Sequence, residues 1–386
     1  MDPRPTLRLS YGKPGMVKRV LIIGGYGNFG SHIARSLAGS SDIRLLIGGR
    51  SVAKAQALIA AIAPVNAAEA HAIDIDGDLV EALARIAPDI VIHTTGPFQA
   101  QDHRVARACI AQRCHYLDLA DARDFVVTIG CLDADAKARD VLVVSGASSV
   151  PCLTAAVMDF YLPCFARLEA VDYGISAAQH TNRGLATTSA VLSYVGKPMT
   201  MLRNGRMKKV FGWEDTHAEY YPELGWRLFG NCDIPDLALF PARYPTLRSM
   251  RFAAGHELKL LHLATRVLGA LVRIGAVQSL DRHARFLLGL AFLFDRFGSG
   301  RSGFHMILTG MGHDGRAKER RLYLIARSGH GPYIPCVPAI LLAQQLATGV
   351  LKRRGAMPCL DLIDLDTYLG ALKGLDVKVI RDAIDA

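Results

Sequence analysis

Over the first 150 residues, short apolar runs alternate with stretches of helical periodicity. Continuous apolar runs flanked by helical segments are typical of strands buried on both faces of a parallel sheet. This pattern predicts a doubly wound sheet of six parallel strands in a Rossmann-type domain over residues 18–150. The expected strands are 20–23, 43–47, 70–75, 90–94, 115–119 and 141–144, and one long helix is expected over 124–139.

The first strand runs directly into a glycine-rich turn, and helical periodicity follows the turn. The turn reads Gly25, Tyr26, Gly27, Asn28, Phe29, Gly30. In the G-x-G-x-x-G pattern, the first glycine allows a tight turn, the second lets the backbone approach a pyrophosphate, and the third lets the helix pack close to the strand. Amides at a helix N-terminus bind phosphate oxygens. The segment therefore predicts a dinucleotide site.

Arg50 and Ser51 follow the second expected strand, and Arg50 comes twenty residues after Gly30. An NAD enzyme usually carries an acidic residue here for the ribose 2′-hydroxyl, whereas a guanidinium can pair with a 2′-phosphate. We therefore expect NADP, with NAD as the alternative; Arg50 could also simply end the strand in solvent. Two further strand ends should contact the cofactor. These contribute Asp74 and Ile75 on the adenine side, and Thr95, Gly96 and Pro97 on the nicotinamide side.

A second domain is expected over residues 151–335. Its alternating strand patterns predict an α+β domain with a mixed sheet. The strands expected are 168–176, 208–211, 250–253, 304–310 and 321–326, with a hairpin signal at His313, Asp314 and Gly315 between the last two. Residues 1–17 are polar, contain prolines and are expected to be a disordered tail.

Residues 257–297 form an apolar helical insertion, expected as two helices joined near 278–283. Lys259, His262, Arg266 and Arg273 recur at nearly helical spacing, which places them on one face of the first helix. The apolar run of 286–294 is far shorter than the roughly 20 residues that span a bilayer. Such a hairpin can lie at a membrane interface, cover a lipid-like substrate, or be buried in a domain core or dimer interface.

The amino-acid composition gives only limited information about the molecules that this protein binds. The chain has 45 Lys and Arg against 35 Asp and Glu, a net charge of +10 that favours anionic partners such as nucleotides or lipid surfaces. No nucleic-acid-binding motif accompanies the basic residues, so no nucleic-acid partner is expected. The eight cysteines show no metal-ligand spacing, so no metal is expected and a reduced, cytoplasmic setting is favoured, with peripheral membrane contact as an open alternative.

Candidates for chemistry are few. His180 lies on an expected second-domain loop and could transfer a proton, although an ordinary surface histidine is the alternative. Asp118 and Asp121 flank the end of the fifth strand, where Asp121 could act as an acid and Asp118 could equally cap the strand. Arg183 could bind a substrate carboxylate or sit in solvent.

Several segments resemble the saccharopine dehydrogenase NADP-binding family. They read DIVIHTTGPF from Asp89, ACI from Ala108, HYLDL from His115 and GASSVP from Gly146. The resemblance implies a nicotinamide cofactor and chemistry at a carbon-nitrogen bond, by reductive condensation of an amine with a carbonyl or the reverse. It also implies a second domain that carries substrate and a homodimer interface, and a chain end, 336–386, that returns to the nucleotide domain. The insertion at 257–297 departs from the family.

The function expected is that of an NAD(P)-dependent oxidoreductase acting at a carbon-nitrogen or carbonyl centre of a small molecule. Because the inserted helices are apolar, an apolar substrate fits better than a highly charged amino-acid adduct. The alternative is a non-catalytic nucleotide-binding protein that associates with membrane or lipid through residues 257–297.

Overall fold

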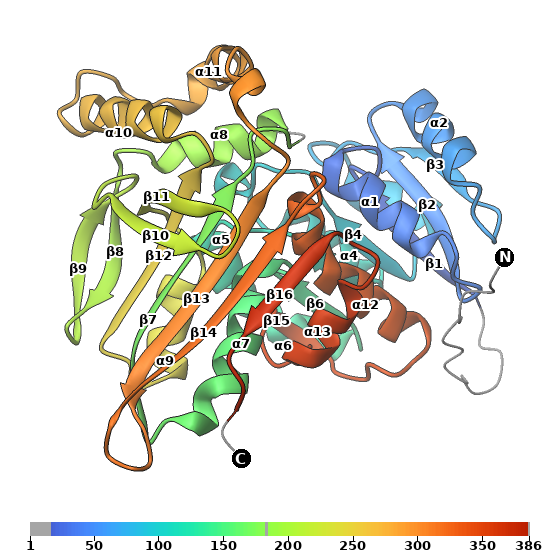
Figure 1. Cartoon of the computed structure of the whole chain (residues 1–386). Coiled ribbons are helices and arrows are strands. Elements are labelled where there is room, and N and C mark those ends of the chain that lie inside the picture. Colours follow the sequence, from blue (N-terminus) through green and yellow to red (C-terminus); the bar gives the residue numbers. More distant parts are fainter. Residues whose placement is uncertain (1–16, 182–183, 385–386) are drawn as a thin grey trace, which may run out of the picture.

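The computed structural model describes residues 17–181 and 184–384, which build two seven-stranded sheets (Figure 1). All strand pairs of the first sheet are parallel, in the order β15-β6-β5-β4-β1-β2-β3. Its strands are β1 (Lys18–Ile23), β2 (Ile43–Gly49), β3 (Glu69–Ala72), β4 (Ile90–His93), β5 (His115–Asp118), β6 (Leu142–Ser145) and β15 (Gly355–Pro358). The predicted Rossmann sheet is confirmed, but it has a seventh strand supplied by the chain end. The tail expected at 1–17 lies outside the described residues except for its last one.

Helices cover both faces of this sheet. They are α1 (Asn28–Leu37), α2 (Val52–Ile62), α3 (Leu79–Ile86), α4 (Arg104–Ala111), α5 (Arg123–Thr128) and α6 (Asp133–Ala138). The single helix expected over 124–139 is wrong, because a 3₁₀ segment (Ile129–Leu132) separates α5 from α6. Gly130 within that segment and the β-branched residues before it are poor helix formers, which explains the break.

Successive residues of β1 pack into two different hydrophobic clusters. Leu21 and Ile23 pack in a cluster with residues of α3 and α4 on one face of the sheet. Val20 and Ile22 face the other way, into a larger cluster that continues into the second sheet. Successive side chains of a strand point to opposite faces of the sheet, so β1 contributes to the apolar core on each face. The larger of the two clusters also joins the parallel sheet to the rest of the molecule.

The second sheet is mixed, as predicted: β12 pairs with β7 in parallel and the other pairs are antiparallel. In spatial order its strands are β10 (His217–Tyr221), β11 (Gly225–Asn231), β12 (Ser249–His256), β7 (Arg167–Ala177), β13 (Ser302–Met311), β14 (Ala317–Ala326) and β16 (Val377–Arg381). The hairpin expected at His313 to Gly315 is confirmed as the turn between β13 and β14. The strand expected at 208–211 is not part of this sheet: it belongs to β9 (Arg206–Phe211), which pairs with β8 (Pro198–Arg203) in a separate ribbon.

The end of the chain contributes to both sheets. Helix α12 (Val337–Ala347) packs against α1, and β15 then pairs with β6 of the nucleotide sheet. After α13 (Leu365–Ala371), β16 pairs with β14 of the second sheet. Residues 336–386 were expected to return to the nucleotide domain; β15 does so, and β16 in addition joins the second sheet.

The apolar insertion forms α10 (Lys259–Arg273) and α11 (Ala284–Phe292), which lie with α8 (Leu185–Tyr194) at one end of the molecule (Figure 1). Lys259, Arg266 and Arg273 are exposed, but His262, which was expected on the same helical face, is buried. Its ring is fully buried, 5.5 Å from the ring of Trp213, and burial lowers the pKa of His262 to about 4. At 100° per residue His262 lies at the edge of the arc of cations, next to the arc of Gly269 and Val272, which are buried against the protein.

Candidate functional site

The turn between β1 and α1 is tightly closed. Gly24 has a φ of +78°, a conformation that favours glycine, and the N–H groups of Gly24 and Gly25 donate to the Gly48 carbonyl at 2.9 and 3.1 Å. A Cβ atom on Gly30 would lie 2.3 Å from the Gly24 carbonyl oxygen. Gly27 precedes α1 and makes no side-chain capping bond. The backbone there can be approached closely, which is what a diphosphate requires.

The glycine turn lies where the strand order reverses, between β1 and β4. Ligands of doubly wound sheets bind at this crevice, at the carboxyl ends of the strands. The Thr94 hydroxyl, after β4, donates to the Ile23 carbonyl at 2.9 Å. The next turn holds Thr95, Gly96 and Pro97, and the Gln101 amide donates to the Thr95 and Pro97 carbonyls at 2.7 and 3.0 Å. The expected nicotinamide-side turn is therefore fixed beside the glycine turn.

The end of β2 carries the residues expected at the adenosine ribose. The N–H of Ser51 donates to the Tyr26 phenolic oxygen at 3.0 Å, and the Ser51 hydroxyl caps α2. Arg50 is exposed and makes no ion pair with any residue in the described ranges. Asp74 is also exposed, and Ile75 is half-buried, just beyond β3. Tyr26, Arg50 and Ser51 are thus brought together at the carboxyl end of β2.

The two aspartates after β5 have different surroundings. Asp118 is fully buried and accepts hydrogen bonds from the N–H groups of Ala120 and Gly146 and from the Ser145 hydroxyl. Burial raises the pKa of Asp118 to about 6. These contacts make Asp118 a structural cap that joins β5 to β6.

Asp121 instead reaches solvent, and its carboxylate accepts a 3.2 Å hydrogen bond from the Gln99 amide. Desolvation by the surrounding protein nevertheless raises the pKa of Asp121. Burial also raises the pKa of Tyr194, at the end of α8, and the neighbouring Cys232 and Asp121 raise it further. The Tyr194 hydroxyl lies 2.8 Å from the Cys232 sulfur.

One ion pair borders this group. Arg123, at the start of α5, pairs with Asp233 and also donates to the Thr200 carbonyl at 3.0 Å. The nucleotide domain thus supplies Asp121 and Arg123, and the second domain supplies Tyr194, Cys232 and Asp233. Sequence reasoning missed the second-domain members because they are distant along the chain and belong to no local motif.

The comparisons with known proteins agree with this geometry. Residues 20–144 match the saccharopine dehydrogenase NADP binding domain. The nucleotide domain belongs to the saccharopine dehydrogenase NADP-binding family. As expected for the cofactor, the members of this family are NADP-binding domains.

Solved structures extend the likeness in fold beyond this NADP-binding domain. The apo saccharopine dehydrogenase (L-Glu forming) of Saccharomyces cerevisiae has a TM-score of 0.68 and 14% identity, covering 95% of this chain and all of that one. An amine dehydrogenase from Mycobacterium smegmatis aligns over 91% of this chain and 95% of its own, with 11% identity and a TM-score of 0.44, too distant to support an argument. No curated protein sequence matches the chain.

The glycine turn of the NADP-binding domain fits the diphosphate of the cofactor. A Cβ on Gly27 would come within 3.1 Å of the Gly24 carbonyl oxygen, so the turn is compact where the phosphates would approach. A second-domain segment closes over the same turn, because a Cβ on Gly184 would lie 3.2 Å from the Asn28 amide nitrogen. The turn therefore lies against the second domain.

His180 lies near that segment but is held by other contacts. Its backbone N–H donates to the Ser299 carbonyl at 2.8 Å, and its Nε2 lies 2.6 Å from the Asp295 carbonyl oxygen. These contacts hold the exposed ring against the segment that follows α11. Arg183, the expected carboxylate ligand, lies outside the described residues.

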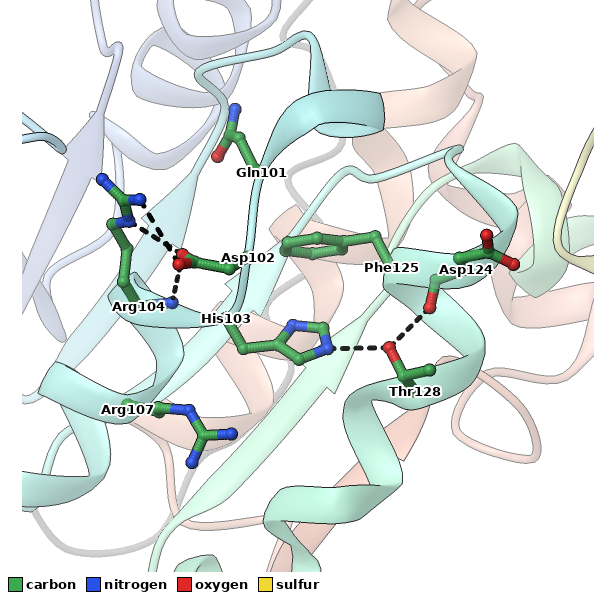
Figure 2. A pocket seen from close by; sticks show the side chains of 8 residues that line it. All are labelled: Gln101, Asp102, His103, Arg104, Arg107, Asp124, Phe125 and Thr128. Atoms are coloured by element: carbon green, nitrogen blue, oxygen red, sulfur yellow. Dashed lines mark hydrogen bonds and ion pairs between the residues drawn. The ribbon is translucent and has the colours of Figure 1, made fainter.

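A separate cavity of about 460 Å³ opens on the NADP-binding domain between α4 and α5 (Figure 2). His103 contacts the Thr128 hydroxyl at 3.0 Å there, and burial lowers the pKa of its imidazole. Gln101, which is hydrogen-bonded to the nicotinamide-side turn, lies at the edge of this cavity. None of the expected cofactor-binding residues lines the cavity. The lining residues are Gln101, Asp102, His103, Arg104, Arg107, Asp124, Phe125 and Thr128.

Proposed function

We propose that the protein is an NADP-dependent oxidoreductase acting at a carbon-nitrogen or carbonyl centre of a small, apolar molecule. The observation that carries this proposal is the position of Asp121. Its pKa is raised, and Gln99 links it to the turn that ends at Pro97, where the nicotinamide is expected. A carboxyl group whose pKa is shifted toward neutrality can exchange a proton beside the hydride-transfer position.

NADPH, when bound, supplies a hydride to the substrate carbon. The chain's own groups position the reactants: amides of the glycine turn bind the diphosphate, and Arg50 pairs with the 2′-phosphate. Thr94 and Gln101 hold the two turns in register. Alignment of this kind lowers the entropic part of the barrier.

Asp121 then completes the reaction on the heteroatom. As the carbon gains the hydride, the nitrogen or oxygen gains an electron pair, and protonated Asp121 gives it a proton. In the oxidative direction the carboxylate removes that proton. The phenol of Tyr194, whose pKa is raised, remains protonated and is available to orient the carbonyl or imine by a hydrogen bond.

The charges beside Asp121 favour an uncharged substrate. Arg123, the cation that follows it, is already paired with Asp233 and bound to Thr200. A charged amino-acid adduct would need a cation that is not already engaged, since a carboxylate brought out of water requires a partner. This supports a neutral, apolar carbonyl or imine.

The decisive test is cofactor binding followed by turnover. Titration calorimetry should detect NADPH binding to the wild-type chain and a loss of about tenfold or more in Gly30→Ala, because the new Cβ meets the Gly24 carbonyl. Gly39→Ala is the matched control, since no atom lies within 4 Å of its Cβ. Folded protein that binds neither NADPH nor NADH would overturn the proposal.

The second candidate is a non-catalytic nucleotide-binding protein associated with lipid through residues 257–297. The exposed apolar helices of that segment favour it. Steady oxidation of NADPH with cyclic imines, or with apolar ketones and amines, would establish the enzyme. Tight NADPH binding without turnover across the whole panel would favour the second candidate.

A further inference from the structure

Helix α10 displays an apolar stripe to solvent. Leu260, Val267 and Ile274 are 63%, 58% and 75% exposed. Leu263 and Leu271 are also exposed and fall between them, so the five residues recur at spacings of three and four along one helical face. An apolar stripe at this spacing normally faces a core.

Helix α11 and the turn after it repeat the pattern. Phe286, Leu290, Leu293 and Phe297 are exposed and again lie three or four residues apart. Large contiguous apolar surfaces are uncommon on soluble proteins and mark binding sites. We call these four residues, with the five of α10, the outer stripe.

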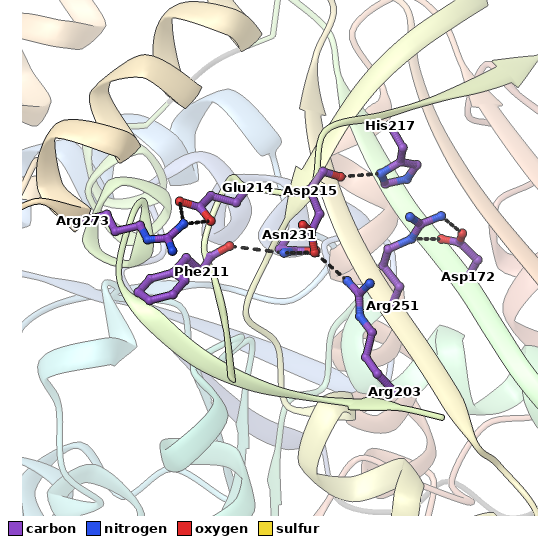
Figure 3. Close-up of polar contacts among 9 residues, drawn as sticks. All are labelled: Asp172, Arg203, Phe211, Glu214, Asp215, His217, Asn231, Arg251 and Arg273. Carbon is purple, nitrogen blue, oxygen red and sulfur yellow. Dashed lines mark hydrogen bonds and ion pairs between the residues drawn. The ribbon is translucent and has the colours of Figure 1, made fainter. Parts of the chain in front are cut away.

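The opposite faces of the two helices are anchored in the protein. Val272 of α10 and Ala284 of α11 are buried in one cluster with Leu192 of α8 and Trp213. Arg273 forms an ion pair with Glu214 and lies 4.2 Å above the Phe211 ring (Figure 3). Because the inner faces are already packed, the outer stripe points away from the body of the molecule.

Hydrogen bonds also fix the base of the helical hairpin to the rest of the protein. The Glu257 carboxylate, just before α10, accepts hydrogen bonds from the N–H groups of Gln179 and Ser299 at 2.8 and 2.9 Å. The Gln179 amide donates to the Ala291 carbonyl in α11 at 2.8 Å. The hairpin is therefore a fixed part of the fold, and its outer stripe is presented in one orientation.

Basic side chains border the outer stripe. Lys259 and Arg266 flank it on α10, Arg285 flanks it on α11, and Arg282 lies in the 3₁₀ turn before α11. All four are exposed and have no ion pair within the described parts of the chain. Arg296 lies over the Phe297 ring at 4.6 Å. The two acids between 258 and 297 are Asp281 and Asp295, both engaged in hydrogen bonds.

We propose that the outer stripe docks on an anionic phospholipid membrane, with its apolar side chains in the headgroup boundary and the bordering cations on lipid phosphates. An apolar face flanked by Lys and Arg has the charge complementary to such a surface. Across residues 17–181 and 184–384, no helix is long and apolar enough to cross a bilayer, so the contact would be peripheral.

Charge also decides between a membrane and a second copy of the chain. A two-fold dimer through the outer stripe would bring the cations that border the stripe in both copies into one interface. Like charges placed opposite each other oppose association. Anionic lipid neutralises this border, whereas self-pairing does not.

Vesicle sedimentation tests the proposal. Wild-type protein should bind vesicles of phosphatidylcholine mixed with phosphatidylglycerol far more tightly than phosphatidylcholine alone, and added salt should weaken binding. Val267→Asp with Leu293→Asp should reduce binding by more than tenfold, since two charges enter the apolar boundary. Arg266→Glu with Arg285→Glu should also reduce it by about tenfold or more, at roughly 1 kcal/mol per cation before reversal.

Val65→Asp and Val350→Asp are matched controls, because these side chains are 66% and 64% exposed elsewhere on the surface. They should leave vesicle binding unchanged, and circular dichroism should show that every variant is folded. Failure of the wild type to bind anionic vesicles would overturn the proposal, as would equal binding by the outer-stripe variants. A dimer that Val267→Asp with Leu293→Asp dissolves, without vesicle binding by the wild type, would assign the surface to self-association. NADPH affinity and turnover are measured separately, so failure here leaves the proposed oxidoreductase untouched and removes only the lipid association of the second candidate.

Discussion

The backbone N–H of Ser51 donates a 3.0 Å hydrogen bond to the phenolic oxygen of Tyr26, which ties the end of β2 to the glycine turn. The Tyr26 ring also lies where a Cβ on Gly49 would have to be, 2.5 Å from the nearest ring atom. Arg50, between Gly49 and Ser51, is therefore held beside the turn with its side chain exposed.

Arg50→Ala should weaken NADPH binding by about 10-fold to 100-fold and change NADH binding by less than about twofold, because only NADPH carries the 2′-phosphate that pairs with the guanidinium. Calorimetric titration with both cofactors measures the difference. Arg85→Ala removes the same charge from the last turn of α3, near the amino end of β4, and should change neither affinity. Equal losses for the two cofactors in Arg50→Ala would remove the preference for NADP.

Tyr26→Phe should have a smaller effect. It removes the acceptor of the Ser51 N–H but keeps the ring against Gly49. A lost neutral hydrogen bond costs about 0.5–1.5 kcal/mol, so NADPH affinity should fall by roughly threefold to tenfold. The same titration checks it, and an effect as large as that of Arg50→Ala would show that Tyr26 contacts the cofactor directly.

Asp121→Asn should lower the rate of substrate reduction by about 10²-fold to 10⁴-fold with little change in NADPH affinity, because an amide cannot supply the proton. In the wild type, reduction requires the protonated acid, so the rate should fall as pH rises through the raised pKa of Asp121. The variant should lack this fall. Asp124→Asn, three residues further along, is the control, and an unchanged pH profile in Asp121→Asn would exclude Asp121 as the proton donor.

Asp236, at the start of α9 (Asp236–Arg243), should make stability depend on pH. It is fully buried, accepts a 3.2 Å hydrogen bond from the Tyr173 hydroxyl, and burial raises its pKa from 3.8 to about 7. Between these values the folded state holds a proton that the unfolded state has released. The contribution to stability is therefore complete below about pH 4 and is lost as pH rises through about 7.

Asp236→Asn removes this titration. The difference in unfolding free energy between the variant and the wild type should grow in favour of the variant by about 1–3 kcal/mol from pH 5 to pH 8. Urea unfolding at the two pH values measures the gain, and Asp135→Asn on the exposed side of α6 should show none. A wild-type to variant difference that is constant with pH would contradict the raised pKa of Asp236.

Local patterns were sufficient for much of the nucleotide domain. The apolar run of β1 is followed at once by glycines whose spacing reflects backbone contacts within a few residues, such as Gly30 against Gly24. The sequence did not predict strand β15, because the strand is short and lies more than 200 residues after its partner β6. The two strands pair only when the whole fold is assembled.

The candidate site was accessible to sequence reasoning only in part. Asp121 could be placed by the end of its strand, but Tyr194 ends an apolar helical run and Cys232 follows a strand on the other sheet. Nothing in either segment indicates that they meet at 2.8 Å. The outer stripe shows a similar limit, since periodicity predicted an apolar face without revealing whether protein covers it.

The pairing of β15 with β6 bears on how the protein is made on the ribosome. Val143 and Val144 cannot acquire their edge partners until residues 356 and 357 have been synthesised and have left the exit tunnel. Until then the β6 edge of the NADP-binding domain has no partner strand. An exposed sheet edge of this kind can pair with the wrong strand. Protection of this edge thus depends on a strand that lies more than 200 residues after β6 in the chain.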